Sequence, residues 1–107
     1  MRQEPLASGA VIEDPEIERL RQEIDRIDHE LLRLLRERAA VVLSVGDRKR
    51  ERELAVYDPA RERALLERLS EEAEAPVDPT AIKAVFSAVV EQCRRLEEEH
   101  MGASLEG

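Results

Sequence analysis

LRQEIDRIDHELLRLLRERAAVVLSVGDRK, residues 20–49, is the stretch that decides the fold of this chain. It contains no proline and a single glycine. Its apolar residues are spaced alternately by three and four positions, which is the pattern of one face of a long amphipathic helix. With one residue upstream, that face consists of Ile17, Leu20, Ile24, Ile27, Leu31, Leu34, Val41 or Val42, and Val45.

One position on this face is charged. Between Leu34 and Val41, the residue that should be apolar is Arg38. A guanidinium directed at a protein core needs an anionic partner, because an unpaired buried charge is very costly. Arg38 is therefore either half of a structural ion pair, with Glu62 or Glu97 as its partner, or part of a site that binds an anion.

Start and stop signals divide the chain into three helices. Asp14-Pro15, Asp58-Pro59 and Asp78-Pro79 each combine an N-cap residue with a proline suited to the first helical position. The expected helices run from residue 15 to about 50, from 59 to about 73, and from 79 to about 100. We expect a mobile N-terminal tail at 1–14, a helical domain at 15–101, and a C-terminal tail at 102–107 with Gly102 as the C-cap.

The first helix is too long for a chain of this size to cover. At about 1.5 Å per residue, a helix from Ile17 past Lys49 is roughly 50 Å long. A compact domain of about 100 residues has a radius of gyration near 13 Å. Its apolar face must therefore find cover on a second chain. The sequence predicts an all-α fold, with three helices per chain and one of them very long, assembled as an intertwined homodimeric helical bundle.

Composition and charge argue against several classes of function. Charged residues make up 39% of the chain and aromatic residues 2%, which is typical of a helical bundle. The formal net charge of -8 argues against binding to nucleic acid or to an anionic membrane surface. No stretch approaches membrane-spanning length, and the first residues lack the apolar core of a signal peptide. Cys93 is the single cysteine, so we expect a cytoplasmic protein without an internal disulfide.

Charged residues beside the apolar face of the first helix are candidates for a site. Arg38 and Lys49 are eleven residues apart, so they share a helix face at a separation of about 16 Å, and their long side chains could bracket one small anion. Arg21 is seventeen residues before Arg38, or about 25 Å along the helix axis. If Arg21 serves the same anion, it must come from a partner chain.

The two shorter helices add further polar candidates. Asp58 caps the second helix, and Arg61 and Glu62 lie in its first turns. Cys93 and Glu97 lie on or beside the apolar face of the third helix, where a carboxyl should have a raised pKa and could donate a hydrogen bond. Each residue alone also fits a plainer role as a cap, a solvated charge or a core thiol. One anion site would explain all of them together.

The same residues carry a resemblance to a known family. The segments are LRQEIDRIDHELLRLLRER, Val45-Gly46 followed by Lys49, YDPARERALLERL and AIKAVFSAVVEQCRRLE. Together they resemble the all-helical class of chorismate mutase over about residues 17–99. The resemblance implies an intertwined dimer whose two sites are each built from both chains. It also implies that chorismate, a small dicarboxylate, is rearranged to prephenate in one pericyclic step, with no metal and no cofactor.

The resemblance implies roles for the cations of the first helix. Arg38, with Arg21 from the partner chain, would hold the two carboxylates of the substrate. Lys49 would contact a carboxylate and the ether oxygen of the breaking bond. Such a site suits the reaction, which needs a folded-over conformer and positive charge beside the developing negative oxygen rather than a nucleophile.

The remaining roles include two departures from a common bacterial pattern. Asp58 and Glu62 would receive the ring hydroxyl, with Arg61 ordering the site. Cys93 stands where many members have a small hydroxyl residue, and Glu97 stands where many have a glutamine. A glutamate can donate a hydrogen bond only when protonated. We therefore expect activity to fall as the pH rises through the pKa of Glu97.

Three other functions are compatible with the sequence. An isochorismate pyruvate lyase on the same scaffold uses a similar cationic site, and only product analysis separates it from the mutase. A catalytically weak helical module could instead regulate, or be activated by, a larger shikimate-pathway enzyme. A plain structural helical dimer would use Arg38 only as half of an ion pair.

Overall fold

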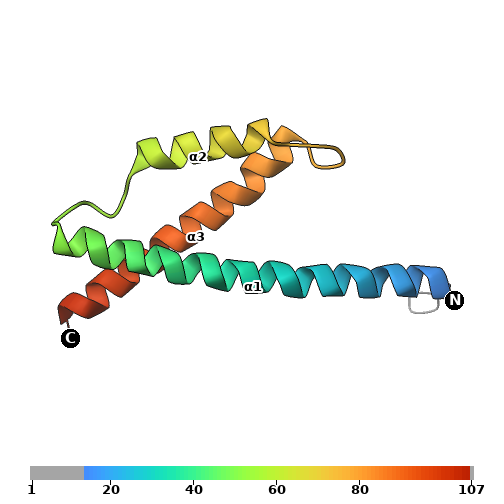
Figure 1. Cartoon of the computed structure of the whole chain (residues 1–107), viewed down its shortest axis with the longest axis horizontal. Coiled ribbons are helices and arrows are strands. Elements are labelled where there is room, and N and C mark those ends of the chain that lie inside the picture. The colour runs from blue at the N-terminus through green and yellow to red at the C-terminus, as the bar shows by residue number, and fades with distance from the viewer. Residues whose placement is uncertain (1–13, 107) are drawn as a thin grey trace, which may run out of the picture. The chain divides into compact units, whose positions relative to one another are not determined.

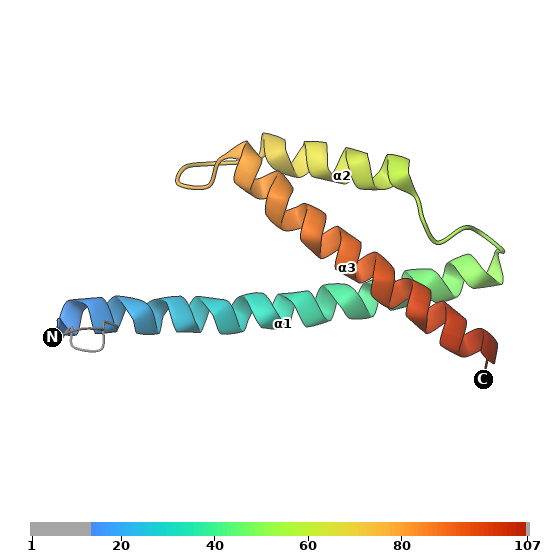
Figure 2. The same cartoon turned by 180° about the vertical axis from the view of Figure 1, so that it is seen from behind.

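The structure, a computed structural model, describes residues 14–106 as three α-helices (Figures 1 and 2). Helix α1 spans Pro15–Glu51, α2 spans Pro59–Glu71 and α3 spans Pro79–Glu106. Within the described residues there is no β-strand, only an isolated β-bridge at 74 and 77 in the connection between α2 and α3. The prediction of an all-α chain with three helices, one of them very long, is confirmed. Of the tail expected at residues 1–14, residues 1–13 lie outside the described part.

Each helix begins at its predicted aspartate. The side-chain Oδ1 atoms of Asp14, Asp58 and Asp78 each accept a hydrogen bond, at 2.8–3.1 Å, from a backbone N–H two or three residues further on. These carboxylates pair N–H groups that the helix itself leaves without an acceptor. In α2 the following proline occupies the first turn, as the sequence predicted.

Helix α1 ends in a Schellman motif. The N–H of Leu54 donates to the carbonyl oxygen of Lys49 at 2.7 Å, and the N–H of Glu53 donates to that of Arg50 at 3.1 Å. Glu53 takes the left-handed conformation that this motif requires, with a φ of 58°. The helix, which the sequence predicted to run to about residue 50, therefore continues to Glu51. Lys49 lies in the last turn of α1.

The end of α3 corrects one prediction. The helix continues to Glu106, so residues 101–106 are helical and Gly102 lies inside the helix rather than capping it. Glycine costs a helix only about 1 kcal/mol relative to alanine, which neighbouring helix-compatible residues can offset. The residues that follow Gly102, ASLE, contain no proline and no second glycine that would stop the helix.

The chain forms two compact units, residues 1–36 and 37–107. The second unit contains the C-terminal part of α1 together with α2 and α3, and α2 packs against α3. In both views, α3 also passes the C-terminal part of α1 (Figures 1 and 2). The buried apolar residues of the second unit are Val90 and Cys93, and Glu97 is buried beside them at 5% exposure. A carboxyl group therefore lies among the core residues of this unit.

Within the described residues, the first unit consists of the N-terminal part of α1. The apolar face of this part remains largely solvent-exposed in the single chain: Ile17 is half-buried, and the other five leucine and isoleucine residues keep 45–55% of their surface, namely Leu20, Ile24, Ile27, Leu31 and Leu34. Three of its arginines pair with the glutamate three positions earlier, namely Arg19 with Glu16, Arg26 with Glu23 and Arg33 with Glu30. Such local pairs support a helix by a few tenths of a kcal/mol each. The apolar face is thus left without cover.

In the part of the chain that the structure describes, no helix combines the length and the apolar character that crossing a membrane would require.

Candidate active site

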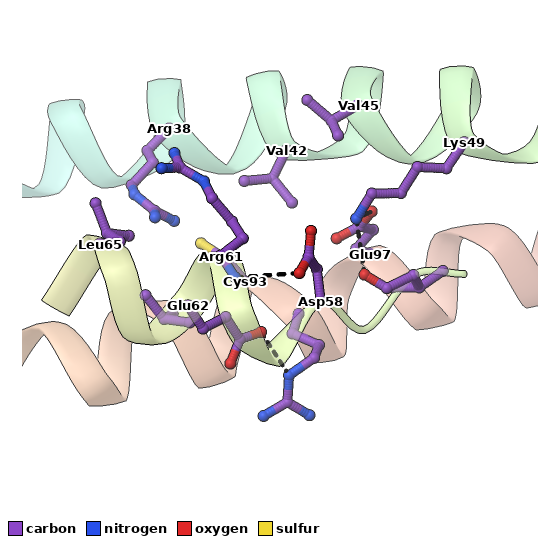
Figure 3. A pocket seen from close by; sticks show the side chains of 13 residues that line it. Arg38, Val42, Val45, Lys49, Asp58, Arg61, Glu62, Leu65, Cys93 and Glu97 are labelled. Atoms are coloured by element: carbon purple, nitrogen blue, oxygen red, sulfur yellow. Dashed lines mark hydrogen bonds and ion pairs between the residues drawn. The ribbon is translucent and has the colours of Figure 1, made fainter. Parts of the chain in front are cut away.

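A cavity of about 350 Å³ lies in the second unit (Figure 3). It is enclosed by the C-terminal part of α1, the connection 52–58 with the start of α2, and the middle of α3. The residues that line it are Arg38, Val42, Val45, Lys49, Val56, Asp58, Arg61, Glu62, Leu65, Val90, Cys93, Arg94 and Glu97. Seven of the eight residues that the sequence singled out are among them, and Arg21 is not.

The lining of this cavity is cationic in balance, although the chain is strongly acidic. It contains four arginine or lysine side chains and three carboxylates, whereas the whole chain carries a formal net charge of -8. Valine and leucine side chains form the walls between these charges. Apolar walls strengthen the field of the charged groups that they separate. The cavity is therefore suited to a small anionic molecule.

Lys49 and Glu97 form a largely buried ion pair across the cavity. Lys49 Nζ lies 3.2 Å from Glu97 Oε2, and the two side chains are 21% and 7% exposed. Lys49 Nζ also donates a hydrogen bond to the carbonyl oxygen of Val56 at 2.7 Å, which ties the connection 52–58 to α1. The ammonium is close to Oε2 without being aligned to donate to it, and within residues 14–106 this oxygen has no hydrogen-bond partner. Since buried polar atoms are nearly always hydrogen-bonded, Oε2 retains capacity for a group bound in the cavity.

Glu62 is held by Arg94, a residue that the sequence analysis did not select. Arg94 Nε donates to Glu62 Oε2 at 3.0 Å, and its guanidinium lies 4.5 Å from the ring centroid of Tyr57. Desolvation lowers the pKa of Arg94, but the hydrogen bond and the negative charge of Glu62 outweigh it, so the pKa is raised. Arg94 thus fixes Glu62 and connects the start of α2 to α3. Nothing in the sequence indicates this pair, because its members are 32 residues apart on different helices.

Arg38 is half-buried and lacks a carboxylate partner within residues 14–106. The structural ion pair with Glu62 or Glu97 is not formed, because each of these carboxylates has another cation within 3.2 Å. Figure 3 shows Arg61 reaching from α2 toward Arg38 on α1. Two guanidinium groups that face one cavity repel each other unless an anion lies between them. Among the described residues that line the cavity, Arg38 and Arg61 are therefore the cations without a carboxylate partner that a bound anion could pair with.

The other candidates occupy different positions. Asp58 is exposed, and its Oδ1 accepts from the backbone N–H of Arg61 at 3.1 Å as the cap of α2. Cys93 is 6% exposed and lines the cavity from α3. Arg21 belongs to the first unit, on the exposed N-terminal part of α1. The catalytic or binding role of each candidate stays a prediction.

The fold and the cavity together define a class: an all-helical protein with a small, mainly cationic pocket for a compact anion. Comparison with known proteins identifies the family within this class. The family model described as chorismate mutase type II matches residues 20–98, and the chain belongs to this family. The resemblance that the sequence carried is thus confirmed.

A curated relative and two solved structures agree with this assignment. The chain is 39% identical over 88 residues to the bifunctional chorismate mutase/prephenate dehydratase of Aquifex aeolicus, an alignment that covers 78% of this chain and 24% of that protein. The chain spans about a quarter of the length of the curated relatives that it matches.

The first of the two structures is a chorismate mutase (form II) from Thermus thermophilus, with 37% identity and a TM-score of 0.75 over 78% of this chain and 94% of that one. The second is a chorismate mutase from Helicobacter pylori in complex with prephenate, with 30% identity and a TM-score of 0.77 over 83% of this chain and 97% of that one. The fold of the chain is therefore that of solved chorismate mutases.

Proposed function

We propose that this chain is a chorismate mutase, an isomerase that rearranges chorismate to prephenate. The observation that carries the proposal is the cationic cavity, in which Arg38 and Arg61 have no carboxylate partner within residues 14–106. A dicarboxylate substrate supplies the negative charge that these guanidinium groups lack. Membership of the family supports the proposal, as does the similar Helicobacter pylori protein that binds prephenate.

The proposed rearrangement takes place around Lys49 and Glu97. Lys49 Nζ has three N–H groups, so it can keep its bond to Val56 and still donate to a substrate oxygen. Because Nζ and Glu97 Oε2 lie 3.2 Å apart, both can reach one oxygen atom that lies beside the pair. Glu97 would donate only in its protonated form, in which it is neutral and no longer forms an ion pair with Lys49. Two donors at the ether oxygen stabilise the negative charge that develops there as the bond breaks.

Binding of the rest of the substrate uses the other lining residues. Arg38 would pair with one carboxylate, and Arg61 would hold that end of the cavity positive. Asp58 and Glu62 would accept from the ring hydroxyl, with the orientation of Glu62 fixed by its pair with Arg94. Cys93 would contribute at most a weak hydrogen bond. Together these contacts hold the folded-over conformer in which the reacting carbons are close.

The proposal includes a homodimer. The exposed apolar face of α1 in the first unit supports it, because five leucine and isoleucine residues at 45–55% exposure form a stripe of helical spacing that a second copy can cover. In this arrangement Arg21 of the second copy would bind the other carboxylate. Each dimer would then have two sites, with residues from both chains in each.

Two further points remain part of the proposal. The single Cys93 is consistent with a cytoplasmic location, since it allows no internal disulfide. A functional association with a shikimate-pathway enzyme is supported by the bifunctional name of the Aquifex aeolicus relative, of which this chain matches 24%.

Product analysis tests the proposed function directly. The purified protein is incubated with chorismate at several pH values and, in parallel, with isochorismate, and the products are identified by NMR. We expect prephenate from chorismate. Pyruvate from isochorismate with unchanged chorismate would identify the lyase instead, and no product from either substrate would favour a regulatory or structural role.

A further inference from the structure

Helix α1 and helix α3 approach each other closely at Gly46, the residue of α1 that is buried. A Cβ atom at this position would lie 2.9 Å from Glu97 Cγ, 3.3 Å from Glu97 Oε2 and 3.5 Å from Met101 Sδ. The optimal separation of two carbon atoms is about 3.5–4.0 Å, so the first of these contacts would be a clash. The side chain of Glu97 occupies space that any other residue at position 46 would fill.

Glu97 has little room to avoid such a clash. The residue is 5% exposed, and the atom that would be struck is Cγ, in the middle of the side chain rather than at its flexible end. A methyl group at position 46 would therefore displace the carboxyl group as a whole. The position of Oε2 beside Lys49 would change with it.

Packing is the reason for a glycine at this position. Gly46 lies within α1, five residues before the end of the helix, where no turn requires it. Inside a helix, alanine is the more stable residue. Lys49 follows one turn later on the same helix and reaches the same carboxyl group. One turn of α1 thus provides both the space for Glu97 and the cation beside it.

We propose that Gly46 is a positioning residue for the rearrangement: by having no side chain, it places the carboxyl group of Glu97 at the ether-oxygen end of the cavity. This inference rests on the proposed function, in which Glu97 donates a hydrogen bond to the substrate. Gly46 itself does not touch the substrate. It acts through the location of Glu97 Oε2.

The first test compares two glycine-to-alanine variants. Gly46→Ala should lower kcat by between about tenfold and a hundredfold with less than about a threefold change in KM, because Glu97 acts mainly in the transition state. Gly102→Ala is the matched control, since Gly102 also lies inside a helix and a Cβ there would meet no atom within 4 Å. This control should keep the kcat of the parent protein. Parental kcat in Gly46→Ala would overturn the proposal.

A second test asks whether Gly46 acts through Glu97. The change Gly46→Ala is repeated in a Glu97→Ala background, where no Cγ remains for the new methyl group to strike. We expect its effect on kcat to shrink to within about twofold, because the two positions are coupled through this contact. An equally large loss in both backgrounds would mean that Gly46 acts by another route and would overturn the proposal.

Thermal unfolding separates this inference from the proposed function. If the parent protein leaves chorismate unchanged, the proposed function fails, but the packing claim is still decided by the melting temperature. Gly46→Ala should lower Tm in the parent background and raise it in the Glu97→Ala background, as Gly102→Ala should raise it in the parent. If Gly46→Ala does not fold, Glu97→Ala should restore folding. A raised Tm in the parent background, or no restoration, would contradict the proposal.

Discussion

The two parts of α1 use their side chains in opposite ways. In the N-terminal part, residues 15–36, three arginines pair with glutamates of the same helix, and five leucine and isoleucine residues of the apolar face stay 45–55% exposed. In the C-terminal part, residues 37–51, polar groups reach other elements. Lys49 pairs with Glu97 at 3.2 Å, and Asp47 Oδ1 lies 2.8 Å from His100 Nε2.

This difference shows which kind of binding partner each part lacks in the single chain. In the N-terminal part, local ion pairs satisfy some of the charges, as at Arg19 and Arg26, and apolar surface stays uncovered, so a second protein surface is needed to cover it. In the C-terminal part, Val42 is half-buried while Val41 and Val45 stay exposed, and Arg38 has no carboxylate partner within residues 14–106. Arg38 is therefore placed to pair with a small anion bound in the cavity.

The largest effect is expected from a charge on the uncovered apolar face. Ile24→Glu would place a carboxylate at the dimer interface of both copies, and burying an unpaired charge costs several kcal/mol. The dimer dissociation constant should rise more than about a thousandfold, measured by sedimentation. Gln22→Glu, which adds the same charge on the opposite side of the helix, should leave dimerisation unchanged. An Ile24→Glu variant that dimerises like the parent would show that this face is not the interface.

The next effect concerns the cation that lacks a partner. Arg38→Ala should lower kcat/KM for chorismate by about 10²- to 10³-fold, the value of a buried charged contact to a substrate carboxylate. It should not lower Tm, because no structural ion pair is lost. A structural dimer would behave in the opposite way, with reduced Tm and no effect of chorismate on the stability of the parent protein.

A smaller, pH-dependent effect is expected at Glu97. A carboxylate accepts hydrogen bonds but cannot donate one, whereas a glutamine amide donates at every pH. The activity of the parent should therefore decline toward high pH, and Glu97→Gln should exceed it there by about tenfold. The measurement is kcat against pH for both proteins. Profiles of the same shape would remove Glu97 from the proposed mechanism.

The smallest effect is expected at the end of α1. Glu53 has a φ of 58°, a left-handed conformation that costs a residue with a side chain about 1 kcal/mol or more. Glu53→Gly should raise Tm by about 4 °C, since glycine adopts this conformation freely. Glu53→Ala keeps the conformational cost and is the matched control. A glycine variant no more stable than the alanine variant would argue against the Schellman motif at this end.

The sequence predicted the features that depend on neighbouring residues. Each helix starts at the aspartate that precedes a proline, because a cap bonds to a backbone group only two or three positions away. The long apolar face of α1 could likewise be predicted from its spacing. Seven candidate residues do line one cavity. For Arg38, Lys49 and Glu97 this could be expected, because charges that interrupt or flank an apolar face point toward the same interior.

Features that depend on distant residues could not be predicted. Arg94 pairs with Glu62 across 32 positions, and only the packing of α2 on α3 brings these two side chains together. The same packing removes Glu62 as a partner for Arg38. The reason for a glycine at position 46 also depends on the tertiary structure, since the clash that Gly46 avoids is with a residue of α3. The end of α3 was predicted too early because one glycine does not stop a helix whose following residues favour it.

In the proposed dimer, one site combines Arg38 from one copy with Arg21 from the other. This arrangement is tested by mixing Arg21→Ala and Arg38→Ala proteins, each inactive alone, after unfolding and refolding them together in equal amounts. Half of the dimers are then mixed, and each mixed dimer has one intact site, so about a quarter of the parental activity should return. Activity no higher than that of the separate variants would contradict a site shared between chains.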